Sequence, residues 1–144
     1  SGFVAGDEKI LKKFLLYRTY HGCAMAPPVQ TASAAAWNDE AHVLDNRNQY
    51  REKFAACTPL IAEVLGTGMP DASFYLWAKT PIADTEFARG LLEHYNVVVL
   101  PGSFLAREVR GVNPGANFIR IALVASLDEC LEAASRIRQF AHKL

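Results

Sequence analysis

Helical periodicity dominates the first half of the chain. Apolar residues follow Asp7 at helical spacing, with lysines on the other face, which predicts a helix to about residue 20. A second helix, rich in small residues, is predicted from about Pro28 to Trp37. The longest helical stretch covers 39–65, and Pro59 is expected to kink or split it. The first six residues are expected to be the end of a strand.

Short apolar runs alternate with helical segments in the second half. The pattern predicts strands over 73–79, 97–100 and 118–123, with helices beginning at Asp84 or Thr85 and at Ser126, where Glu129 completes a capping box. Residues 101–103 are expected to form a turn, and 107–115 a polar loop. The expected fold class is therefore α/β, of the α+β kind. A small mixed sheet of about three to four strands carries helices packed on it, and a helical segment precedes it.

Composition narrows the class of protein. The chain has 144 residues, 51% of them hydrophobic and 21% charged, which suits one globular domain. Fifteen basic residues balance fifteen acidic ones, so the charge expected of a protein that binds nucleic acid or a membrane surface is missing. Three scattered cysteines without a C-x-x-C spacing argue against a zinc ribbon and favour a reducing, cytoplasmic compartment. The opening Ser1-Gly2-Phe3, without Met, suggests a processed, tagged or partial chain.

Arg120 is the strongest candidate for chemistry. It stands between Ile119 and Ile121 in an apolar strand, and a charge there must be paired or must face a cleft. Its planar guanidinium can bind a carboxylate through two parallel hydrogen bonds, which predicts a ligand anchor. The alternative is an arginine on an edge strand that reaches solvent, or one that pairs with an internal Asp or Glu.

Three weaker candidates have ordinary structural explanations beside the functional ones. The segment Pro101-Gly102-Ser103-Phe104 could cradle an anion with its backbone N–H groups, or it is a plain turn. His21 and Cys23 suggest a base and a nucleophile, although nothing nearby would orient them, and loop or interface contacts explain them as well. One helical face carries Asp39, His42 and Asp45, which could bind a metal, but a solvated face is favoured and no metal site is predicted.

Four stretches together resemble the C-terminal part of a fold-type-I aminotransferase of class I/II, a family that depends on pyridoxal phosphate (PLP). They are residues 1–7, the Pro101-Gly102-Ser103-Phe104 turn after a valine strand, the strand from Asn117 to Leu123, and the final amphipathic helix. Order and spacing agree over essentially the whole chain. The run from Leu16 to Met25 is most similar to succinyldiaminopimelate aminotransferases, which act in lysine biosynthesis.

The resemblance implies roles for several parts of the chain. Arg120 would hold the α-carboxylate of the substrate, and a loop with Tyr20, His21, Gly22 and Cys23 would reach the active site of the partner subunit in a homodimer. Residues 1–38 would be the end of the large domain and an interface segment, 39–65 a bent interdomain helix, and 66–144 the C-terminal small domain. The parent would be a cytoplasmic enzyme that moves an amino group between an amino acid and a 2-oxo acid, namely N-succinyl-diaminopimelate and glutamate, with PLP as electron sink.

The same resemblance implies that this chain is incomplete as an enzyme. The family's Schiff-base lysine would precede Ser1, and Lys9, Lys12 and Lys13 do not match it. We therefore predict that the chain alone neither binds PLP covalently nor transaminates. Two other interpretations stay open. One is a standalone, non-catalytic α/β module that binds a carboxylate or regulates a partner, and the other is a helical interaction segment over 7–65 fused to a small α+β domain.

Overall fold

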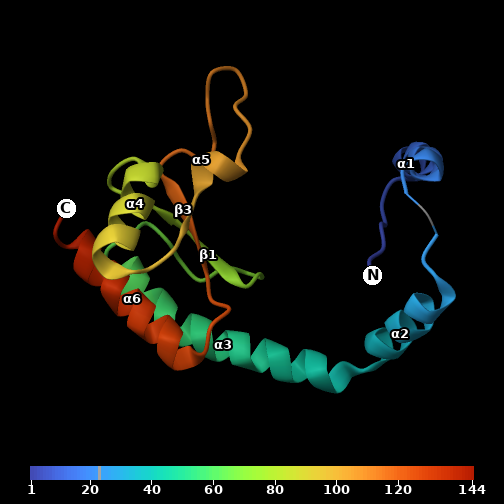
Figure 1. Ribbon diagram of the computed structural model, residues 1–144, viewed down its shortest axis with the longest axis horizontal. Helices are drawn as coiled ribbons and strands as arrows, with labels where there is room; N and C mark the ends of the chain where they lie inside the picture. The colour runs from blue at the N-terminus through green and yellow to red at the C-terminus, as the bar shows by residue number, and fades with distance from the viewer. Residues whose placement is uncertain (23) are drawn as a thin grey trace. The chain divides into compact units, whose positions relative to one another are not determined.

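The computed structural model describes residues 1–22 and 24–144, and their contacts divide the chain into two units (Figure 1). The first unit is Ser1–Asp45 and the second is Asn46–Leu144. Most of the internal packing belongs to the second unit, which contains the whole hydrophobic core.

The first unit holds helix α1 (Glu8–Tyr20), helix α2 (Pro27–Asn38) and the start of helix α3 (Glu40–Ala62). Asp7 caps α1 as predicted, because its carboxylate accepts hydrogen bonds from the backbone N–H groups of Lys9 and Ile10. Neither α1 nor α2 buries a side chain. Residues 1–6 were expected to be the end of a strand, but no strand among the described residues pairs with them and they form none.

The second unit is built on a three-stranded sheet with β3 (Phe118–Ala122) in the centre. Strands β1 (Tyr75–Lys79) and β2 (Leu100–Pro101) flank β3, and each runs antiparallel to it. The α/β fold class is confirmed, but the sheet is antiparallel rather than mixed. The unit β1–α4–β2 does bring its two strands into the same direction, yet β3 inserts between them, so no parallel pair of strands is adjacent.

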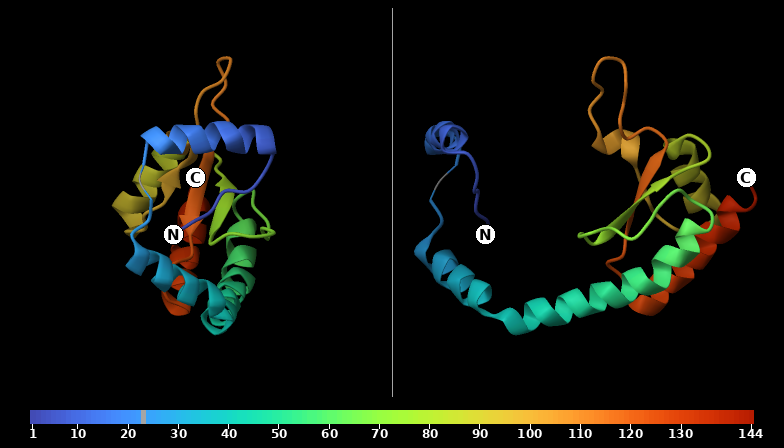
Figure 2. Two further views of the ribbon diagram at one scale, coloured as in Figure 1. Left: turned by 90° about the vertical axis from the view of Figure 1, so that its right-hand side faces the viewer. Right: turned by 180° about the vertical axis from the view of Figure 1, so that it is seen from behind.

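Within the second unit as described, helices cover one face of this sheet, and no helix of the unit covers the other face (Figure 2). The covering helices are α4 (Asp84–Tyr95), α6 (Leu127–Ala141) and the C-terminal half of α3. Phe87 of α4 meets Phe140 of α6 edge to face, with ring centroids 5.0 Å apart. Alternation along the strands sends one set of side chains into this core. The fully buried side chains at its centre are Phe87, Ile61, Leu76, Leu91, Ile119, Ile137 and Cys57.

The prediction for the start of α6 is confirmed, whereas the predicted break of α3 at Pro59 is not found. The capping box of α6 is confirmed, because Ser126 and Glu129 exchange hydrogen bonds between side chain and backbone. Helix α3 is not split at Pro59 but continues to Ala62. Packing of the turn that contains Cys57, Thr58 and Ile61 into the core outweighs the backbone hydrogen bond lost at proline.

Strand β2 is shorter than the valine run predicted. Residues 97–100 were expected to be a buried strand, but only Leu100 belongs to β2, and Val98 is 80% exposed. The run lies at the edge of the sheet, so one side of it lacks a neighbour. The cysteines fit their expected role where they are described: Cys57 and Cys130 are buried core residues, and Cys23 lies outside the described residues. None of the described helices is long and apolar enough to cross a membrane.

Candidate functional site

Arg120 stands in the middle of the central strand. It is paired in register with Trp77 of β1 and Leu100 of β2, so it is not on an edge strand. None of the ion pairs among the described residues includes it, and its Nε atom is buried without a hydrogen-bond partner. The guanidinium carbon lies 5.6 Å from the centre of the Tyr75 ring. Arg120 is therefore neither on an edge strand nor in an ion pair among the described residues, and its Nε is a buried donor without a partner.

The face of the sheet around Arg120 is aromatic and open. Phe118 and Arg120 share one face of β3 by strand alternation, and Trp77 and Tyr75 lie on the same face of β1. The rings of Trp77 and Phe118 stack with centroids 5.6 Å apart, and Trp77 keeps 38% of its surface exposed. The Tyr75 ring lies against the guanidinium, and partial burial of this kind strengthens hydrogen bonds from a cation to an anion. This arrangement suits a small carboxylate.

Asp84 connects the start of α4 to Ser103 and to Asn117, the residue before β3, a role that the sequence did not reveal. Asp84 or Thr85 was expected at the start of this helix as its cap, but Ala83 is the N-cap residue, and Asp84 is the first helical residue and 5% exposed. Its two oxygens accept backbone N–H bonds from Ser103 at 2.9 Å and from Asn117 at 3.2 Å. Burial would raise the pKa of this carboxyl, but the hydrogen bonds from Ser103 and Asn117 outweigh it and lower the pKa. A charged carboxylate thus fastens the start of α4 to the segment that leads into β3.

The first residues of the Pro101-Gly102-Ser103-Phe104 segment, Pro101 and Gly102, are buried, whereas Phe104 is exposed. The segment enters a one-turn helix, α5 (Gly102–Leu105), instead of a plain turn. A Cβ atom on Gly102 would lie 2.4 Å from the carbonyl oxygen of Gly115 and 2.8 Å from the Trp77 ring, so only glycine fits. The N–H of Ser103 already donates to Asp84. The segment therefore supports the wall beside Trp77, and its Ser103 N–H is not available to an anion.

The other sequence candidates lie in the first unit. Tyr20 is 78% exposed, and His21 stacks on Tyr17 with ring centroids 4.6 Å apart. Gly22 adopts a positive φ of 134°, and Cys23 lies outside the described residues, so the role of this loop at a partner's active site stays a prediction.

Two of the residues on the predicted polar helical face, Asp39 and His42, contact each other in the structure. His42 contacts Asp39 at 3.1 Å, and its hydrogen bond lowers the pKa of that carboxyl. No group of three or more metal-ligating side chains is found in the described parts of the chain.

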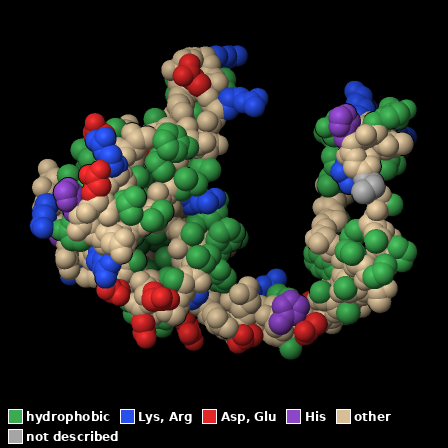
Figure 3. Space-filling view, in the orientation of Figure 1, with side chains coloured by type: hydrophobic (Ala, Val, Ile, Leu, Met, Phe, Trp, Pro, Cys, Tyr) green, Lys and Arg blue, Asp and Glu red, His purple; other side chains and the backbone are tan. Residues whose placement is uncertain are grey.

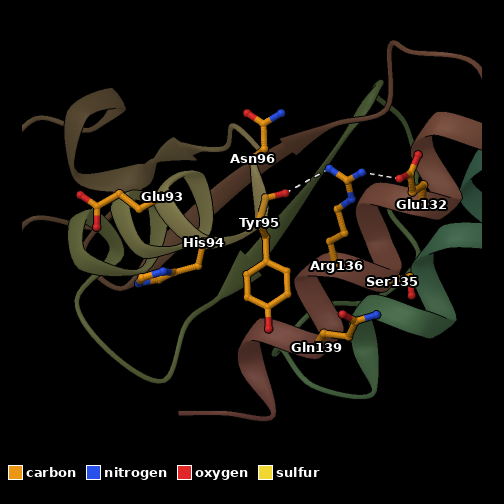
Figure 4. Close-up of a pocket in the computed structure, with 8 residues that line it drawn as sticks. All are labelled: Glu93, His94, Tyr95, Asn96, Glu132, Ser135, Arg136 and Gln139. Atoms are coloured by element: carbon orange, nitrogen blue, oxygen red, sulfur yellow. Dashed lines mark hydrogen bonds and ion pairs between the residues drawn. The ribbon is translucent and has the colours of Figure 1, made fainter.

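A separate hollow lies between the C-terminal end of α4 and α6 (Figure 4). Arg136 projects into it, donates to the carbonyl oxygen of Tyr95 at 3.1 Å and pairs with Glu132. This arginine has its partners within the chain, unlike Arg120. The guanidinium of Arg136 thus has partners within the chain, so it offers no unpaired charge to a ligand in this hollow.

The lysines do not fit a covalent PLP site. A lysine that binds the cofactor must become neutral, which requires burial or a neighbouring charge of the same sign. Lys9, Lys12 and Lys13 are exposed on α1, where Lys12 pairs with Glu8 at 2.7 Å. Lys79 and Lys143 are exposed as well. Among the described lysines, Lys53 alone is half-buried, and its ammonium lies over the Tyr50 ring.

An arginine without an ion pair, beside aromatic rings on a sheet face, has the chemistry to bind a small carboxylate. The comparisons with known proteins identify the family: the chain belongs to the class I and II aminotransferases, whose family model matches residues 1–137. An aminotransferase structure from Neisseria meningitidis is 54% identical, with a TM-score of 0.83 over 96% of this chain and 35% of its own.

Two further relatives are more distant. A structure of a probable N-succinyldiaminopimelate aminotransferase from Thermus thermophilus is 36% identical, with a TM-score of 0.61 over 74% of this chain and 28% of its own. A probable aminotransferase of Mycobacterium tuberculosis is 31% identical over 95% of this chain and 31% of its own length. The chain spans about a third of the length of the curated relatives it matches.

Proposed function

We propose that this chain supplies the substrate-carboxylate site of a PLP-dependent aminotransferase. The observation that carries the proposal is Arg120, a central-strand arginine with a buried, unpartnered Nε on an open aromatic face. Its guanidinium would hold the α-carboxylate of the amino acid, and then of the 2-oxo acid, through charge-assisted hydrogen bonds. This fixes the orientation of the reacting carbon while leaving the amino group free.

The side chains of this domain indicate which part of the reaction it would serve. The lysines described above do not suit covalent attachment of PLP, so the chain would contribute to binding the substrate and not to the cofactor's chemistry. Residues 1–38 would belong to the large domain and an interface, 39–65 would connect the domains, and 66–144 would form the small domain. The exposed Tyr20 and the loop after it would reach the partner's active site in a homodimer.

The substrate pair we propose is N-succinyl-diaminopimelate and glutamate, in a cytoplasmic enzyme of lysine biosynthesis. The name of the Thermus relative, at 36% identity, supports this choice. So does the similarity of the run from Leu16 to Met25 to succinyldiaminopimelate aminotransferases.

The test is the Arg120→Ala variant of the full-length aminotransferase that contains this chain. Losing charged hydrogen bonds to the α-carboxylate should raise the KM for every amino donor by about ten- to hundredfold. The absorbance of bound PLP should stay unchanged. Arg89→Ala, which removes an exposed arginine from α4, is the matched control. An unchanged KM in Arg120→Ala would leave the standalone carboxylate-binding or regulatory module as the better explanation.

A further inference from the structure

Tyr75 is the aromatic residue whose ring contacts the guanidinium of Arg120. The ring centre lies 5.6 Å from the guanidinium carbon, within the range of an attraction between a cation and an aromatic face. Trp77 is the register partner of Arg120, but its ring stacks on Phe118 instead, with centroids 5.6 Å apart. Figure 3 shows the surface of this unit, where apolar and basic side chains gather beside one another. Of the rings on this sheet face, Tyr75 is therefore the one that meets the arginine.

The register of the sheet explains why these two side chains meet. Tyr75 of β1 faces Ala122 of β3, and Arg120 lies two residues before Ala122 on the same face of the strand. Such diagonal neighbours are within reach of each other when one side chain is aromatic and the other is long. The side chain of Ala122 is exposed and ends at Cβ, so it leaves room for the Tyr75 ring to lean across β3.

The position of Tyr75 is fixed by the residues around the start of β1. Ser73 has a φ of 112°, which residues other than glycine rarely adopt. Its hydroxyl oxygen accepts a hydrogen bond from the backbone N–H of Tyr75 at 3.3 Å, and the carbonyl oxygen of Phe74 accepts one from the N–H of Leu123 at 2.9 Å. The Phe74 ring meets the Tyr75 ring edge to face, with centroids 5.4 Å apart. Backbone and ring contacts together thus hold Tyr75 in place.

Arg120 itself has few contacts that could orient its side chain. None of the ion pairs among the described residues includes it, and its Nε lacks a hydrogen-bond partner. An arginine that is ordered only by its ligand loses rotamer freedom on binding, which weakens the complex. A ring beneath the guanidinium carbon restrains the side chain beforehand and occupies none of its N–H donors. The donors then stay available to a carboxylate.

We propose that Tyr75 is a positioning residue, whose ring holds the Arg120 guanidinium ready for the α-carboxylate of the substrate. This inference rests on the proposed function, since it names a residue that acts at the same site through Arg120. The ring, and not the phenolic hydroxyl group, would carry the effect, because the contact is made with the ring.

The experiment is a double-mutant cycle in the full-length, PLP-loaded enzyme, with glutamate as the amino donor. Tyr75→Leu should raise the KM for glutamate by about three- to thirtyfold and leave kcat within about twofold, as expected when a cation loses its ring. Tyr75→Phe keeps the ring and should change KM by less than about twofold. In an Arg120→Ala background, Tyr75→Leu should add no further loss, because no guanidinium is left to position.

Three results of this cycle would overturn the proposal. They are an unchanged KM in Tyr75→Leu, an equal loss in Tyr75→Phe and Tyr75→Leu, and a loss in Tyr75→Leu that persists in full when Arg120 is absent. Should Tyr75→Leu fail to fold, Tyr75→Met takes its place, since its unbranched side chain adapts to the space that the ring leaves.

Tyr50→Leu is the matched control. Tyr50 belongs to α3 and also has a cation over its ring, the ammonium of Lys53 at 5.1 Å from the ring centre. This variant removes a similar contact from a cation other than Arg120, so it should leave the KM for glutamate within about twofold. A loss as large as that of Tyr75→Leu would show that KM responds to lost packing in general, and would refute the positioning role.

Chemical labelling of Arg120 separates this proposal from the proposed function. Phenylglyoxal modifies accessible guanidinium groups, and peptide mass spectrometry follows the rate at Arg120 in the same enzyme. Once released from the ring, Arg120 should react at least about threefold faster in Tyr75→Leu than in the wild type. If Arg120→Ala leaves KM unchanged but Tyr75→Leu still speeds the labelling, the proposed function fails and the positioning of Arg120 stands. If the labelling rates are equal, the positioning proposal fails.

Discussion

Replacing Asp84 tests how the site is held together. This carboxylate is 5% exposed and accepts two backbone N–H groups, from Ser103 and Asn117. Alanine would remove both acceptors and leave two buried donors without partners. Asparagine keeps the shape but offers one acceptor oxygen, and its NH₂ group would face the second N–H.

The magnitude follows from the two contacts. Hydrogen bonds to a charged group contribute about 1.5–3 kcal/mol each, and the favourable position at the start of α4 adds about 0.3–1 kcal/mol. We expect Asp84→Ala to lower the free energy of unfolding by about 3–7 kcal/mol at pH 7, and Asp84→Asn by about half as much. At roughly 4 °C per kcal/mol, the alanine variant should melt about 12–28 °C lower.

The assay is urea unfolding, followed by circular dichroism at several pH values. Because the folded-state pKa of Asp84 lies below the unfolded value of 3.8, its stabilisation is fully present above that pH. The stabilisation is lost as the pH falls further, through the lower folded-state pKa. The difference between wild type and Asp84→Ala should therefore be largest at neutral pH and shrink in acid.

The control is Asp128, another aspartate in the first turn of a helix but an exposed one. Asp128→Ala should cost less than about 1 kcal/mol, since only the helix dipole is affected. Equal losses in the free energy of unfolding for the two alanine variants would refute the assignment of Asp84 as a buried hydrogen-bond acceptor that connects α4 to Ser103 and Asn117. So would a difference from wild type that grows in acid.

Three further outcomes are expected. Gly115→Ala should cost at least about 2 kcal/mol in urea unfolding, because its Cβ would lie 2.1 Å from the carbonyl oxygen of Gly102. Gly68→Ala, with open space around it, should be nearly neutral, and equal losses would contradict the packing argument. The Cys57 thiol, whose pKa is raised by burial to about 11, should resist iodoacetamide at pH 8 until urea is added, as peptide mass spectrometry would detect. Borohydride reduction of the isolated chain with PLP should label no specific lysine in peptide mapping, whereas one uniquely labelled lysine would contradict our prediction.

Local patterns were sufficient for most of the helices. Asp7 and Ser126 were recognised as caps because a cap needs only a side-chain oxygen and the next few N–H groups. The strand with Arg120 was equally clear, since an arginine between isoleucines stands out against a period of two. The predictions of local elements were wrong where the neighbouring strands determine whether a segment joins the sheet. Residues 97–100 read as buried, yet most of the run stayed outside the sheet because the run lies at its edge.

The sequence by itself determined that an arginine would lie on one face of an apolar strand in a small sheet covered by helices, because periodicity and capping are local properties. Only the tertiary structure decided that this strand is central and antiparallel to both neighbours, and that Asp84 is a buried fastening rather than a cap. Strand order and the partners of a buried carboxylate depend on contacts between segments that are far apart in the chain. The spacing of residues along the sequence does not indicate which of these segments will be in contact.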